Sequence, residues 1–153
     1  MRRRALIAAA LGLAVVLVDL GPASRRARAD NNIPDLTMFP DYFGAFTSSA
    51  TGVGSVEFEI TRQEGRHFWG VVTFEFGGLG TAGFEFHGTV AATNEFKGKG
   101  SGPAGEVVFD GMLDPIPAGD KVFIIMADYM FMSADGRMDE GTVFATNAPI
   151  GGR

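Results

Sequence analysis

An aromatic side chain followed two residues later by glycine recurs five times in this chain and constrains its fold more than any other feature. The five units are Tyr42-Phe43-Gly44, Phe68-Trp69-Gly70, Phe86-His87-Gly88, Phe96-Lys97-Gly98 and Phe109-Asp110-Gly111. Glycine weakens a strand and usually marks a bend, a bulge or a close approach of two backbones. A neighbouring ring can cover the exposed backbone, and such glycine kinks allow a sheet to curve and close. The repeat therefore predicts one curved sheet in which Gly44, Gly70, Gly88, Gly98 and Gly111 are structural.

Alternation of apolar and polar residues around these units predicts strands rather than helices. In residues 67–76, Phe68, Gly70, Val72 and Phe74 fall on one face at the two-residue period of a strand. Strands are predicted at 42–48, 54–62, 67–76, 84–91, around 96–100, 106–113, 121–132 and 138–146. An antiparallel up-and-down sheet of about eight strands removes its edges by closing into a barrel. The sequence thus predicts an all-β protein with a single barrel over residues 42–146.

The first 29 residues have the composition of an export signal. Arg2, Arg3 and Arg4 form a basic start, and residues 5–18 form an uncharged apolar run. This run is shorter than the roughly 20 residues that a helix needs to cross a bilayer. Ala27-Arg28-Ala29 then offers an A-x-A cleavage site. Cleavage nearer Ala23 and an uncleaved membrane anchor are the alternatives. We therefore expect a signal peptide over 1–29, a secreted or periplasmic protein, an extended lead-in over 30–41 and a tail over 147–153.

This organisation resembles that of calycin-type secreted β-barrels, the group that contains the lipocalins and avidins. The shared features are an export signal, eight hairpin-connected strands and the aromatic-x-glycine units, including the early Tyr42-Phe43-Gly44. The lipocalin G-x-W signature and the avidin tryptophan set are absent, since Trp69 is the single tryptophan. The resemblance implies a barrel and a binding function, and it assigns no ligand residue.

The net charge argues against binding to nucleic acids and to anionic lipids. Removal of residues 1–29, which hold six arginines and one aspartate, leaves seven basic and 17 acidic residues, a net charge of about −10. Nucleic acids and anionic lipids are bound through lysine and arginine. We therefore expect no nucleic-acid partner. Because the apolar run lies in the leader, we also expect no membrane span after processing.

The chain has no cysteine, so its stability must come from the burial of a core rather than from disulfides.

The strand predicted at 121–132 supplies the candidate ligand residues. Asp128 stands in a strand that is apolar on both faces, where an unpaired charge is costly to bury. It could anchor the polar group of a small apolar ligand in an interior lined by phenylalanine and methionine, or pair with a lysine, or lie on the outer wall. The candidate ligand-binding residues are Asp128, Met126, Met130, Tyr129, Phe74 and Phe86. Periodicity leaves open which face of the strand points inward, with a slight preference for the aromatic one.

Metal and catalytic chemistry are weaker alternatives. If strands 68–76 and 84–91 pair, we expect His87 near Thr73 or Val71, and a histidine and glutamate group could then hold a metal. The thioethers of Met126, Met130 and Met132 are ligands suited to Cu(I), although packing in the core is the more ordinary use of methionine. No nucleophile elbow is present, so we expect no catalytic residue, metal or cofactor.

Two functions of different classes remain. The first is binding of a small apolar molecule inside the barrel. The second is a structural or interaction module whose barrel is packed solid, and an enzyme, metal-dependent or otherwise, comes third. The presence of an interior cavity of a few hundred Å3 would distinguish the first from the second.

Export can be tested on the protein itself. Because basic, apolar and small-residue segments follow one another in the order of a signal peptide, we expect cleavage after Ala29. Intact-mass measurement of the exported protein should find Asp30 as its first residue. An exported product that keeps residues 1–18 would contradict this assignment.

Overall fold

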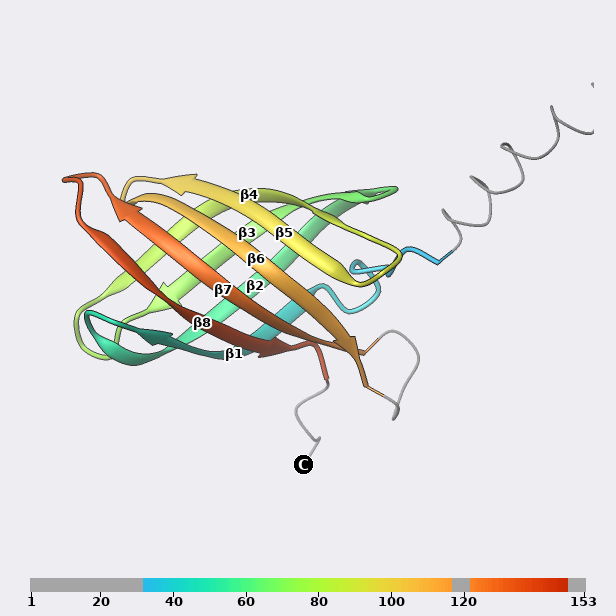
Figure 1. Ribbon diagram of the computed structural model, residues 1–153, viewed down its shortest axis with the longest axis horizontal. Helices are drawn as coiled ribbons and strands as arrows, with labels where there is room; N and C mark the ends of the chain where they lie inside the picture. The colour runs from blue at the N-terminus through green and yellow to red at the C-terminus, as the bar shows by residue number, and fades with distance from the viewer. Residues whose placement is uncertain (1–31, 117–121, 149–153) are drawn as a thin grey trace, which may run out of the picture. The chain divides into compact units, whose positions relative to one another are not determined.

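A computed structural model describes residues 32–116 and 122–148. The signal peptide predicted for residues 1–29 lies outside these ranges, as do Lys121 and most of the tail predicted for 147–153. Within them the chain forms eight antiparallel strands in sequence order, and the first pairs with the last to close a barrel (Figure 1). The predicted all-β fold, an up-and-down barrel of eight strands, is confirmed.

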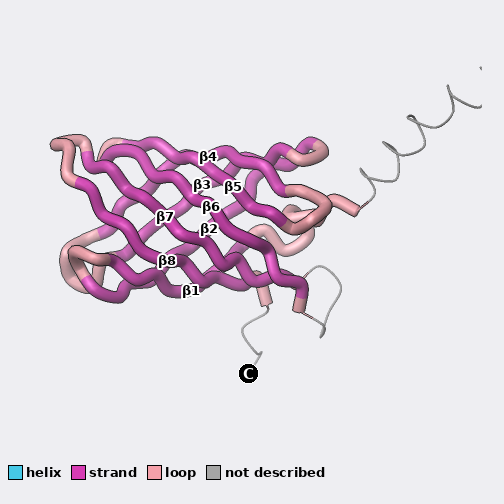
Figure 2. The backbone as a smooth tube through the Cα atoms, viewed as in Figure 1, coloured by secondary structure: helices cyan, strands magenta, loops and turns pink. Residues whose placement is uncertain are grey.

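The strands follow the predicted positions closely. They are β1 (Asp41–Ser48), β2 (Gly52–Glu64), β3 (His67–Glu75), β4 (Thr81–Val90), β5 (Glu95–Gly102), β6 (Gly105–Pro115), β7 (Phe123–Ser133) and β8 (Met138–Thr146). They run obliquely around the barrel (Figure 2), as closure of a sheet requires. In the ranges that the structure describes, no helix is long and apolar enough to cross a membrane.

The predicted register between β3 and β4 is wrong. His87 lies opposite Trp69 rather than Thr73 or Val71, and Glu75 lies opposite Thr81. The reason is a tighter turn. Phe76 donates its amide to the Gly80 carbonyl (2.9 Å), and glycines with positive φ at 77, 78 and 80 let β4 begin at Thr81.

Aromatic rings fill the interior of the barrel. Phe58 lies near its centre, with ring centroids 5.6 Å from Phe86 and 5.3 Å from Phe109. Phe68 stacks on Phe96 at 5.2 Å, and Phe74 on Phe109 at 6.1 Å. These separations are those of rings in direct contact. The core of the barrel is therefore solid where these rings meet.

The aromatic face of β7 points inward. Phe123, Ile125 and Tyr129 are buried, whereas Met126 and Met130 are exposed on the outer wall. This agrees with the slight preference for the aromatic face, which matches the phenylalanine faces of the other strands. The methionines consequently do not line the interior, because the two faces of a strand alternate and the rings take the inner one.

The glycines of the repeated unit lie beneath rings or against neighbouring backbones. A Cβ atom at Gly88 would lie 2.1 Å from the Lys97 carbonyl oxygen and 2.6 Å from Cζ of Phe68, the residue opposite it on β3. One at Gly70 would lie 2.9 Å from the Phe86 ring. Gly98 differs, since its nearest neighbour would be 3.4 Å away, which leaves room for a methyl group. The structural role predicted for Gly98 is thus weaker than that of the others.

The predicted lead-in closes one end of the barrel, which we call the lead-in end. Leu36 is buried in the core, and its amide donates to Gln63 Oε1 (2.8 Å). Gln63 in turn donates to the Pro34 carbonyl (2.8 Å). Asn147, just after β8, donates to the Phe39 carbonyl (3.2 Å). Residues 33–40 are therefore part of the folded barrel.

Substitution of an inward glycine should cost stability. Gly88→Ala places a methyl group against the Lys97 backbone and the Phe68 ring, so the free energy of unfolding should fall by about 1–3 kcal/mol. Gly83→Ala is a matched control in the same strand, because a Cβ atom there meets nothing within 4 Å. Thermal unfolding of both variants measures the difference, and equal melting temperatures would contradict this account of the glycines.

Candidate functional site

The barrel closes through a short seam between β1 and β8. Their backbone ladder covers Phe43–Phe46 of β1 and then stops. Beyond it, the Thr47 hydroxyl accepts a hydrogen bond from the Thr142 amide (3.1 Å) and shares another with the Thr142 hydroxyl (2.9 Å). The Ser49 amide donates to the Glu140 carbonyl (3.0 Å). The Thr47 side chain and one further backbone hydrogen bond thus join the two strands where the ladder ends.

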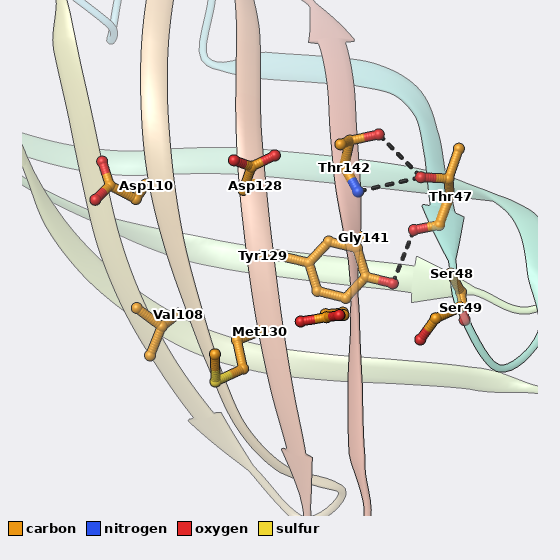
Figure 3. A pocket seen from close by; sticks show the side chains of 11 residues that line it. Thr47, Ser48, Ser49, Val108, Asp110, Asp128, Tyr129, Met130, Gly141 and Thr142 are labelled. Carbon is orange, nitrogen blue, oxygen red and sulfur yellow. Dashed lines mark hydrogen bonds between the residues drawn. The ribbon is translucent and has the colours of Figure 1, made fainter.

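Tyr129 reaches this seam from β7. Its hydroxyl lies 3.0 Å from the Thr47 carbonyl oxygen on β1 (Figure 3). Gly141 of β8 stands between them, and a Cβ atom there would lie 1.7 Å from that oxygen and 3.0 Å from Tyr129 Cε1. Burial and then the nearby Asp139 carboxylate raise the pKa of Tyr129. The predicted ligand residue Tyr129 therefore serves to hold three strands together.

Asp139 is a buried carboxylate at the end opposite the lead-in end. It accepts hydrogen bonds from Ser48 Oγ (2.8 Å), Ser49 Oγ (2.9 Å), the Ala50 amide (3.2 Å) and the Tyr129 hydroxyl (3.1 Å). Burial by itself would raise the pKa of Asp139, but these hydrogen bonds outweigh it and hold the pKa below its usual value. The carboxylate joins the β1–β2 turn to β7 and β8.

A second buried hydroxyl has no such network. Tyr42 is fully buried near the lead-in end, and among the described residues its hydroxyl has no hydrogen-bond partner. Burial, followed by the negative charge of Asp35, raises the pKa of this phenol. The neutral phenol is thus the form that the core retains.

A groove of about 670 Å3 lies on the outer wall beside the seam. Its lining comes from β6, β7, β8 and β1 and includes Val108, Asp110, Asp128, Met130 and Thr142 (Figure 3). Asp110 and Asp128 are direct partners across β6 and β7, where like charges repel. Lys97 approaches Asp110 at 3.9 Å, while no cation within the described ranges forms an ion pair with Asp128.

Exposed apolar side chains surround this groove. We call the following set the methionine face: Val108, Met112, Met126, Met130, Met132, Met138 and Phe144. Met112, Met126 and Phe144 form one row across β6, β7 and β8, because each lies opposite the next. Contiguous exposed apolar surface on a folded protein commonly marks a binding surface.

The wall that carries the methionine face is also acidic. Strands β6, β7, β8 and β1 contain no lysine or arginine. Their exposed acidic side chains are Asp41, Glu106, Asp110, Asp114, Asp128 and Glu140. The basic residues of the strands, Arg62, Lys97 and Lys99, lie on β2 and β5. The barrel therefore has one wall that is both apolar and anionic.

The six predicted ligand residues divide between the two sides of the barrel wall. Phe74 and Phe86 lie in the aromatic core, and Tyr129 lies inside with its hydroxyl at the seam. Asp128, Met126 and Met130 point outward, so they do not share a site with the phenylalanines. Asp128 and Met130 do line the outer groove together. Any role of these residues in binding stays a prediction.

Sequence reasoning missed Asp139 and Gly141. Asp139 occupies an inward position in the alternation of β8, and this position is the signal that could have found it. Gly141 is not part of an aromatic-x-glycine unit, so the sequence pattern does not indicate its role. Among the described residues, no group of three or more histidine, aspartate and glutamate side chains could hold a metal ion.

Comparisons with known proteins leave the family open. Neither the scan against protein-family models nor the search of curated proteins finds a match to this chain.

The Asp139 network should contribute measurably to stability. Asp139→Asn removes a charged acceptor and places amide hydrogens against donors, which should lower the free energy of unfolding by about 1–3 kcal/mol at neutral pH. Asp128→Asn is the matched control, because Asp128 is exposed on the outer wall. It should not lower the melting temperature, since it also relieves the repulsion from Asp110. A similar loss in both variants would contradict the role given to Asp139.

The same carboxylate predicts a pH dependence. Its pKa is lower in the folded protein than the value of about 3.9 in an unfolded chain. The stabilisation is therefore complete above that value and is lost as the pH falls through the folded pKa. Chemical unfolding should show that the free energies of unfolding of the wild-type protein and Asp139→Asn differ less in acid than at neutral pH. A difference in unfolding free energy that does not depend on pH would contradict this role of the Asp139 carboxylate.

Proposed function

We propose that this protein is an exported, non-catalytic binding module that uses its outer wall. The packed barrel serves as the scaffold, and the methionine face with its groove binds a partner that is both apolar and cationic, such as a basic amphipathic segment of another protein. Export rests on the leader at 1–29, and a place among calycin-type barrels rests on the resemblance of the strand pattern. The observation that carries the proposal is one wall that combines exposed apolar side chains with an excess of carboxylates. Two of these, Asp110 and Glu106, are paired with Lys97 and Lys99 of the neighbouring strand β5.

The packing of the interior supports an outer rather than an inner site. The enclosed space between Phe74, Phe84, Tyr129 and Phe131 is about 10 Å3, roughly the room for one water molecule. Pockets for small ligands are typically about 300–1,000 Å3. A small apolar ligand inside the barrel would have to displace rings that already contact one another, so this alternative has less support.

The chemistry of the wall supports the class of partner. Methionine side chains are flexible and polarisable, and surfaces rich in them adapt to different apolar partners. The carboxylates around them, with no lysine or arginine on the same four strands, favour a cationic partner and speed its approach. Amphipathic segments present both an apolar and a charged face.

A labelled peptide of alternating leucine and lysine residues tests this function. Fluorescence anisotropy should detect binding that weakens with added salt, because the charges are at the surface. Phe144→Ser should weaken binding through lost apolar contact, and Asp110→Asn combined with Asp128→Asn through lost charge. Each should weaken binding about fivefold, which corresponds to about 1 kcal/mol.

Matched controls lie on β3 and β4, the strands across the barrel from β7 and β8. Leu79→Ser removes an exposed apolar residue of the β3–β4 turn, and Glu75→Gln with Glu85→Gln removes two exposed charges there. These variants should bind the peptide as the wild-type protein does. Absence of binding, or an equal loss in variants of both walls, would contradict the proposed surface.

A further inference from the structure

Three thioether side chains gather where β7 and β8 meet at their hairpin. Met132 and Met138 are direct partners in the ladder, and Met130 precedes Met132 by two residues on the same outer face. Opposite residues of antiparallel strands have Cβ atoms about 4.5–5.5 Å apart, and diagonal neighbours at about 7–8 Å remain within reach of long side chains. The three sulfur atoms can therefore converge above one point of the wall.

Core packing does not account for these methionines. Their exposed fractions are 47% for Met130, 48% for Met132 and 60% for Met138. Filling irregular gaps in a core is the ordinary use of methionine, and side chains as exposed as these fill none. What distinguishes them from other apolar residues in such positions is the thioether itself.

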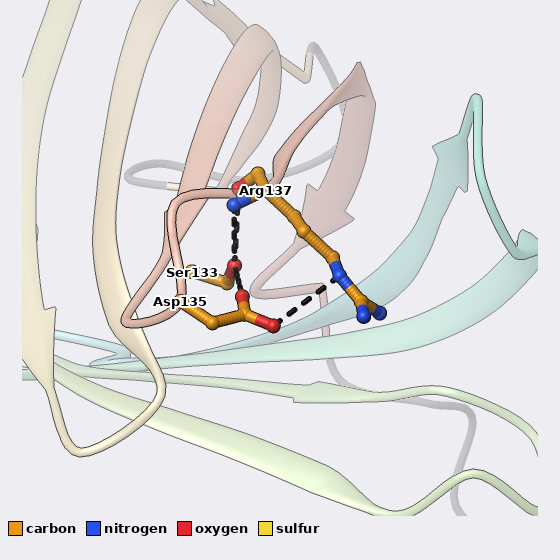
Figure 4. A network of polar contacts seen from close by, with 3 residues as sticks. All are labelled: Ser133, Asp135 and Arg137. Carbon is orange, nitrogen blue, oxygen red and sulfur yellow. Dashed lines mark hydrogen bonds and ion pairs between the residues drawn. The ribbon is translucent and has the colours of Figure 1, made fainter.

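The hairpin that brings Met132 and Met138 together is held by its own polar network (Figure 4). The Ser133 amide donates to the Arg137 carbonyl (2.8 Å), and the Arg137 amide donates to Ser133 Oγ (2.9 Å). Asp135 accepts from the Ser133 hydroxyl and forms an ion pair with Arg137 Nε at 3.2 Å. Because these contacts already hold the hairpin, binding of a ligand costs less conformational entropy in bringing the two methionines together.

Two carboxylates flank the same point. Glu106 lies opposite Met132 on β6, where it is also paired with Lys99 at 3.7 Å, and Glu140 lies opposite Met130 on β8. Thioethers are soft ligands suited to Cu(I), and a nearby carboxylate favours a cation. We propose that Met130, Met132 and Met138 form a Cu(I) site, with Glu140 providing negative charge beside it. The site uses one end of the methionine face and goes beyond the binding of a protein partner.

Competition with a chromogenic Cu(I) chelator under anaerobic, reducing conditions tests the site on the purified protein. We expect the wild-type protein to withhold one equivalent of Cu(I). The triple variant Met130→Leu, Met132→Leu, Met138→Leu keeps the apolar surface and removes the sulfur atoms, so its affinity should fall at least tenfold. Its melting temperature serves as the check that it is folded.

A matched control lies on the same face. Met112→Leu with Met126→Leu removes two exposed thioethers that are also direct partners, and it should leave Cu(I) affinity unchanged. No binding by the wild-type protein, or equal binding by the triple variant, would overturn the proposal. Equal weakening in the control would overturn the assignment to these three residues.

Two further measurements locate the metal and separate the metal site from the partner surface. In a protein labelled at the methionine methyl carbons, Ag(I), a redox-stable substitute for Cu(I), should shift three methyl signals, those lost in the triple variant. Shifts of other methyl signals alone would overturn the site. Because leucine preserves the apolar surface, the triple variant should still bind the leucine–lysine peptide. Failure of the metal site and failure of the partner surface are therefore separate results.

Discussion

The structure depends on the packing of aromatic rings against glycines inside the barrel. Phe68 lies opposite Gly88, and Phe86 lies opposite Gly70, so each ring occupies space that a side chain would otherwise take. The same glycines let neighbouring backbones approach closely, with the Lys97 carbonyl only 2.1 Å from where a Cβ atom of Gly88 would lie. Strands that approach and coil in this way can close around a narrow interior. Without the glycines, the rings would have no room and the sheet would lie flatter.

The filled interior supports the proposal that binding uses the outside of the barrel. The rings meet at contact distance, and the enclosed space among Phe74, Phe84 and Phe131 holds about 10 Å3. The outer surface is not uniform. The strands β6, β7, β8 and β1 carry methionine and acidic side chains, whereas the strand lysines and arginine lie on β2 and β5. The packing of the core and the uneven distribution of side chains on the outer wall thus both support the methionine face as the proposed binding surface.

The seam shows how the barrel is closed where regular pairing ends. The ladder between β1 and β8 is short, and the hydroxyls of Thr47 and Tyr129 with the Asp139 carboxylate continue it. A buried carboxylate is tolerated because four donors lie within hydrogen-bond distance of its oxygens. Its place at the end of the barrel ties the β1–β2 turn to the last hairpin. This seam also borders the outer groove, so the closure of the fold and the candidate binding surface share residues.

The sequence by itself determined the all-β fold and indicated where most of the glycines that lie close to rings or backbones would fall. A two-residue period and aromatic-x-glycine units are local properties, and they specify strands, hairpins and a curved sheet wherever they occur. The Asp135-Gly136 pair between β7 and β8 is likewise a local hairpin signal. The β3–β4 register escaped prediction because it depended on three glycines with positive φ in the turn, which no pattern of alternation records.

Only the tertiary structure decided which side of β7 faces inward, and with it the character of the candidate site. Both faces of that strand are apolar, so periodicity could not choose between Met130 and Tyr129 for the core. The choice was made by neighbours distant in sequence, since the rings of Phe46 and Phe74 pack against Tyr129. Gly141 and Thr47 likewise gained their roles only when closure brought β8 beside β1. Side chains that meet across a closed barrel are specified by its packing, and no single segment contains that information.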